Sequence, residues 1–158
     1  MPRLRLITAL CLLPVLAAAA PTDEAVVLPA KASVYLGTMT LALTPLIRTG
    51  TRFESTYTAQ FFPLVFFGEQ GRFWIEASDA DLARVVKGEA VTFTGEAEST
   101  DHEKHRVTGR ITPKDAASGT IHVRVFVTST AAIPFDSSYR FTGKPAPSGG
   151  PAAASGGK

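Results

Sequence analysis

The side chains best suited to chemistry gather in one short run, Asp101-His102-Glu103-Lys104-His105. Imidazole and carboxylate groups ligate zinc and copper, and the two histidines of this run could share one ion. The run falls between two expected strands, however, and not on a helix that would bring both rings to one face. A solvated turn is therefore the competing interpretation, and we expect no metal and no other cofactor. The third histidine, His122, falls on the polar side of its own expected strand.

The sequence carries no motif for nucleophilic or acid–base catalysis. It has no Gly-x-Ser-x-Gly run, and its one cysteine, Cys11, lies in an expected leader. Its acidic residues are spread along polar faces, without a pair among apolar neighbours where a raised pKa would suit catalysis. We expect a protein that is not an enzyme, and an enzyme or metal-binding protein that uses His102 and His105 remains an alternative.

The most unusual stretch is FFPLVFFGEQGRFWI, residues 61–75, which holds five of the ten phenylalanines and the one tryptophan. Two apolar runs flank Gly68-Glu69-Gln70-Gly71, a pattern that predicts a β-hairpin with its turn at these four residues. Apolar side chains occupy both faces of this hairpin, so either a short helix covers the second face or it is a patch for a ligand or partner. The candidate binding residues are Phe62, Phe66, Phe67, Trp74 and Phe126.

The rest of the chain alternates apolar and polar residues with a period of two, which is typical of half-buried β-strands. With the hairpin, these segments predict about seven antiparallel strands in an all-β sandwich or small barrel, with an OB-like barrel as the alternative. The alternating segments are 35–43, 53–61, 91–97, 107–111, 121–127 and 135–141.

One segment breaks the alternation between the third and fourth expected strands. Ser78-Asp79-Ala80-Asp81 resembles a capping box, with Ser78 as N-cap and Asp81 at position N3. Leu82, Val85 and Val86 follow at helical spacing, and Lys87-Gly88 is a good stop. The sequence therefore predicts one short helix over residues 79–87.

The two ends of the chain differ from its centre in composition. Residues 1–20 combine Arg3 and Arg5 with an apolar run and small residues, which predicts a cleaved signal peptide and a periplasmic or extracellular location. Residues 21–31 are expected to form an N-terminal extension, residues 32–143 a single β domain, and residues 144–158 a disordered tail rich in proline, alanine, glycine and serine.

The net charge of the chain argues against nucleic acid as a partner. Of the 16 basic residues two are Arg3 and Arg5, so the chain without its leader has 14 basic and 14 acidic residues. A neutral domain does not attract nucleic acid, and no membrane span is expected after leader removal. The sequence favours a small exported module of the bacterial envelope that contacts a protein or envelope polymer through the aromatic hairpin. The alternative is a carrier of an apolar, lipid-like small molecule held between sheets or inside a barrel.

Overall fold

The computed structural model describes residues 22–35, 37–64 and 68–142. The expected leader and tail, and the candidate residues Phe66 and Phe67, lie outside the described residues. The described elements are β1 (Glu24–Val27), β2 (Ala30–Val34), β3 (Gly37–Leu43), β4 (Leu46–Thr49), β5 (Arg52–Phe62), β6 (Gly68–Glu76), α1 (Asp79–Val86), β7 (Val91–Ser99), β8 (Lys104–Pro113), β9 (Ser118–Phe126) and β10 (Ala132–Phe141).

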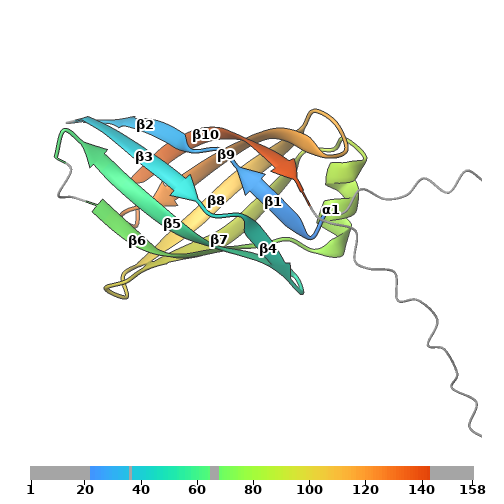
Figure 1. The fold of residues 1–158 in the computed structure, drawn as a ribbon, viewed down its shortest axis with the longest axis horizontal. Coiled ribbons are helices and arrows are strands. Elements are labelled where there is room, and N and C mark those ends of the chain that lie inside the picture. Colours follow the sequence, from blue (N-terminus) through green and yellow to red (C-terminus); the bar gives the residue numbers. More distant parts are fainter. Residues whose placement is uncertain (1–21, 36, 65–67, 143–158) are drawn as a thin grey trace, which may run out of the picture.

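Eight of these strands close into an antiparallel barrel (Figure 1). Around the ring the order is β5, β4, β1, β10, β9, β8, β7 and β6, and β6 pairs with β5 to close it. β3 continues along β5 beyond β4, and β2 pairs with β3. The prediction of an all-β fold with a small barrel among its forms, and with one short helix, is confirmed.

Three strands, β1, β2 and β4, were not predicted from the sequence. The segment expected to be an N-terminal extension supplies β1 and the start of β2, and β1 pairs with β10 from the far end of the chain. β4 is four residues long and follows Pro45 directly. Such short segments, separated by prolines and built partly from alanine, give little period-two signal, and barrel closure supplies the pairing that keeps them extended.

The turn of the aromatic hairpin was predicted at the wrong residues. Gly68, Glu69 and Gln70 belong to β6, where they pair with Gln60, Ala59 and Thr58 of β5. β5 ends at Phe62 because the next residue is a proline, which has no N–H to donate to the ladder. The connection between the two strands therefore falls between Phe62 and Gly68, and the predicted turn residues are part of the barrel wall.

Period-two alternation turns one face of each strand into the barrel. On β5, Phe53 and Tyr57 are buried while Glu54 and Thr56 between them are exposed. The largest buried side chains inside the barrel come from every part of the ring. They include Leu46, Phe53, Phe73, Ile75, Phe93, Val107, Ile121, Phe135 and Tyr139.

Helix α1 covers one end of the barrel, which we name the closed end (Figure 1). Ser78 Oγ accepts the Asp81 N–H at 3.1 Å and Asp81 Oδ2 accepts the Ser78 N–H at 3.3 Å, so the predicted capping box is confirmed. Leu82 and Val85 are buried, and the helix contacts β7 and β8. Arg48 of β4 forms an ion pair with Asp79 in the first turn of the helix.

The opposite end, which we name the open end, carries the connections after β2, β5, β7 and β9. No described helix lies there (Figure 1). The two ends of the barrel are therefore built differently, and the candidate site lies at the second.

Candidate functional site: a cavity in the open half of the barrel

A cavity of about 560 Å³ occupies the barrel interior at its open end. We name it the lumen cavity. Its walls are mainly apolar, and its polar groups lie toward the connections at the open end. The described lining residues are Met39, Leu41, Tyr57, Ala59, Phe61, Leu64, Gly68, Glu69, Phe73, Ala97, Ser99, Asp101, Glu103, His105, Val125, Val127, Ile133 and Phe135.

Small inward-facing side chains on two strands contribute to the space of the cavity. On β5 the inward position changes from Phe53 at the closed end to Ala59 in the cavity wall. On β7 it changes from Phe93 to Ala97. Eight-stranded barrels are generally just wide enough to be filled by side chains, so small residues at these positions leave space that larger ones would take.

Three polar side chains meet inside the lumen cavity. The Tyr57 hydroxyl donates a hydrogen bond to Glu69 Oε1, and His105 Nε2 lies 3.5 Å from the same oxygen. These groups come from β5, β6 and β8, and the barrel places them on its inner face. The Glu69 side chain is 39 % exposed and that of His105 15 % exposed, so the group lies at the transition from cavity to solvent.

The Tyr57 hydroxyl is held in its neutral form. Burial is the largest cause of a raised pKa, and the hydrogen bond to Glu69 and the nearby Glu103 carboxylate raise the pKa further. A phenol that stays protonated acts as a hydrogen-bond donor and not as a base or nucleophile. The polar group is therefore suited to holding a ligand's polar end.

The histidine-containing run forms the turn between β7 and β8. Ser99 is buried and its Oγ accepts the N–H groups of Asp101 at 3.2 Å and Glu103 at 3.1 Å, which shapes the turn. His102 has a positive φ of 65° and its ring lies 3.2 Å from Glu98 in solvent, whereas His105 faces the lumen cavity.

The two histidines thus point to different environments. Among the described residues, no group of three or more histidine, cysteine, aspartate or glutamate side chains is arranged to hold a metal ion. The interpretation of the run as a solvated turn fits His102 and does not fit His105, which continues the inward face of β8.

The predicted aromatic residues that the structure describes, Phe62, Trp74 and Phe126, lie on the outside of the barrel and do not converge. Phe62 is 68 % exposed at the open end. Trp74 is half-buried on the outer face of β6, between Glu54 and Glu96 of the neighbouring strands. Phe126 on β9 packs under Arg106, whose Cζ lies 4.0 Å from the ring centroid.

Two strands separate β6 from β9 in the ring, so Trp74 and Phe126 are roughly 14 Å apart at the strand spacing of barrels. Helix α1 does not cover these residues, because it stands over the closed end.

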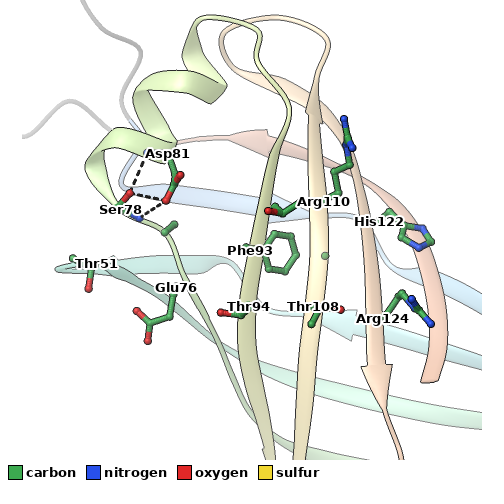
Figure 2. A pocket seen from close by; sticks show the side chains of 13 residues that line it. Thr51, Glu76, Ser78, Asp81, Phe93, Thr94, Thr108, Arg110, His122 and Arg124 are labelled. Carbon is green, nitrogen blue, oxygen red and sulfur yellow. Dashed lines mark hydrogen bonds between the residues drawn. The ribbon is translucent and has the colours of Figure 1, made fainter. Parts of the chain in front are cut away.

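A second depression, of about 590 Å³, lies on the outer surface beside the start of α1 (Figure 2). Its side chains are mostly polar and several already bond to one another or to neighbours: Ser78 to Asp81, and His122 to Asp136 at 2.7 Å. Arg110 and Arg124 lie along adjacent strands at its edge (Figure 2). A ligand here would compete with existing contacts, and the lumen cavity is the better candidate.

Sequence reasoning missed the polar group of the lumen cavity, although a signal for it was present. The inward series Val107, Gly109 and Ile111 on β8 extends backward by two residues to His105. The inward series of β6 likewise extends from Phe73 through Gly71 to Glu69, which the predicted turn concealed. In a barrel, polar residues that continue the apolar inward face of a strand are expected to line the lumen.

Comparison of the chain with protein-family models, with curated proteins and with solved structures found no match. Within the part of the chain that the structure describes, no helix has both the length and the apolar character needed to cross a membrane.

Proposed function

We propose that this protein is a small, non-catalytic carrier that binds an elongated apolar molecule in the lumen cavity. The observation that supports the proposal is an apolar-walled cavity of about 560 Å³ inside a barrel of eight strands. Cavities that hold small molecules are commonly about 300–1,000 Å³, mostly apolar and furnished with a few convergent polar groups. The expected signal peptide would place this carrier in the periplasm or outside the cell.

Closing the cavity with a bulky side chain tests the proposal. Ala59 lines the cavity, whereas Thr58, its neighbour on β5, is exposed on the outer face. We expect the full chain to bind dodecanol saturably with one site in isothermal titration calorimetry. Ala59→Trp should abolish this binding, and the matched control Thr58→Trp should retain it. Absence of binding by the parent chain, or equal binding by both variants, would reject the carrier.

A second candidate function is contact with a protein or envelope polymer through exposed aromatic residues. It is favoured by Phe62 at 68 % and Tyr35 at 103 % relative exposure, both at the open end. A photo-crosslinking amino acid at position 62 should then capture a defined partner in the cell envelope. The control is position 47, because Ile47 is also exposed but lies on β4 near the closed end. Equal capture at both positions would count against a specific contact.

A further inference from the structure

The charged groups that line the lumen cavity share one sign. They are the carboxylates of Glu69, Asp101 and Glu103, with the imidazole of His105 beside them. Among the described lining residues there is no lysine or arginine. The residues that flank His105 in the sequence, Lys104 and Arg106, are basic but exposed on β8. Arg106 packs on Phe126 outside the barrel.

Glu69 has capacity for one more partner. Both contacts that the described side chains make with it, from Tyr57 and from His105, use Oε1. Its second carboxylate oxygen is therefore available, among the described residues, to accept a hydrogen bond from a group in the cavity. An ionised carboxylate only accepts hydrogen bonds, so the complementary group on a ligand must be a donor.

We propose that the lumen cavity selects apolar molecules whose polar end donates hydrogen bonds, above all a primary ammonium group, and excludes fatty acids. This inference rests on the proposed carrier function and names the class of molecule carried. A cationic donor would pair with Glu69 while its chain fills the apolar wall, and a hydroxyl would make the same contact without the charge. A fatty-acid carboxylate would meet like charges and find no lysine or arginine among the described lining residues.

The test compares three ligands with the same twelve-carbon chain: dodecylamine, dodecanol and dodecanoic acid. Each is titrated into the full chain at pH 8, below its critical micelle concentration. Hydrogen bonds to charged groups are strong enough that we expect about tenfold or greater preference for the amine over the acid, with the alcohol between them. Equal affinities, or tightest binding of the acid, would overturn the inference.

Two substitutions locate the preference. Glu69→Gln keeps the side-chain shape and removes the charge, so the amine should bind about tenfold more weakly and the acid more tightly. The control is Glu96→Gln on the outer face of β7, which should leave all three affinities unchanged. If Glu69→Gln fails to fold by circular dichroism, Glu103→Gln should show a shift in the same direction. An unchanged preference in the folded variant would overturn the role of the acidic residues.

Failure of this inference is distinguishable from failure of the carrier. If Ala59→Trp blocks all three ligands but their affinities in the parent chain are equal, the cavity binds apolar chains without selecting their polar ends. If no twelve-carbon ligand binds, or if Ala59→Trp has no effect, the carrier itself is rejected.

Discussion

The two ends of this barrel share strands β5 to β10 and differ in what fills them. At the closed end, large inward side chains such as Phe53 and Phe93 belong to one buried core with Leu82 and Val85 of the capping helix. At the open end, the corresponding inward positions of β5 and β7 carry Ala59 and Ala97. The difference shows how one barrel can divide its interior, with packing at the closed end and space for a ligand at the open end.

Glycine supports the dense packing of the closed half. A Cβ on Gly109 would collide with the Phe93 ring, so glycine at this position of β8 leaves the room that the aromatic side chain needs. In the open half, Ala59 of β5 and Ala97 of β7 line the lumen cavity. We infer that stability depends mainly on the closed half and that ligand binding depends mainly on the open half.

The largest expected effect tests this division with two matched substitutions on β5. Phe53→Ala removes a ring that is 3 % exposed and should lower the free energy of unfolding by about 3–5 kcal/mol, because a cavity remains. Phe61→Ala removes a half-buried ring that already faces the lumen cavity, and we expect a loss below about 2 kcal/mol.

Guanidinium denaturation measures both losses, and titration with dodecanol measures affinity. If both variants remain folded, Phe61→Ala should bind dodecanol more weakly than the parent chain, and Phe53→Ala should bind it equally well. Equal losses of stability in the two variants would show that the open half is as tightly packed as the closed half.

A smaller effect is expected at the helix cap. Ser78→Ala removes the hydroxyl that accepts the Asp81 N–H, and caps of this kind contribute about 1 kcal/mol. The variant should lose stability and keep its affinity for dodecanol, because α1 lies at the end opposite the lumen cavity. Weakened binding would show that the two ends are coupled.

The same cap gives the closed end a dependence on pH. The hydrogen bond from the Ser78 hydroxyl lowers the pKa of Asp81 below its ordinary value of 3.8. A group whose pKa is lower in the folded state stabilises the fold above its unfolded pKa, and this stability is lost as the pH falls. We expect the free energy of unfolding to decrease from about pH 5 to pH 2, and the decrease should be shallower in Ser78→Ala.

The sequence predicted features that depend on neighbouring residues better than features that depend on closure of the barrel. Alternation in β5, β7, β8, β9 and β10 and the capping box at Ser78 depend on neighbouring residues, so local patterns reveal them. The pairing of β1 with β10 joins Ala25 to Phe141 and has no local signal. The lumen cavity is a property of the space between strands, which depends on side chains that meet only after the barrel closes.

The predicted site illustrates the same limit. The aromatic richness of residues 61–75 was noticed, but the turn was placed on Gly68–Gly71, so the inward series of β6 from Phe73 to Glu69 was not followed. A shift of the turn by a few residues decided whether Glu69 lay in a loop or in the barrel wall. Polar residues of the lumen were therefore missed although their strands were found.

The smallest expected effect concerns a tyrosine of the closed half that makes a useful contrast with Tyr57. Tyr139 is 5 % exposed, and its hydroxyl has no hydrogen-bond partner among the described residues. Its ring packs edge-on against Phe141, with centroids 5.4 Å apart. Its environment is therefore that of a phenylalanine, whereas Tyr57 donates to a carboxylate.

Replacing each tyrosine with phenylalanine should separate these two roles. Tyr139→Phe removes a buried hydroxyl without a partner, so we expect stability at pH 7 to change by less than about 1 kcal/mol and to rise if it changes. Tyr57→Phe should be destabilising, because the Glu69 carboxylate loses its donor. Chemical denaturation at neutral pH measures both, and a clear loss in Tyr139→Phe would reveal a partner for its hydroxyl.

Alkaline pH sharpens the same contrast. Burial raises the pKa of Tyr139 to about 12, with the Asp115 carboxylate as a second cause. A group whose pKa is raised in the folded state stabilises the fold below its unfolded pKa of 10.0, and this stability is lost as the pH rises toward the folded value. The parent chain should therefore lose stability between pH 10 and pH 12, and Tyr139→Phe should lose less over the same interval. Parallel pH profiles for the parent and the variant would show that Tyr139 ionises as readily in the folded barrel as in the unfolded chain.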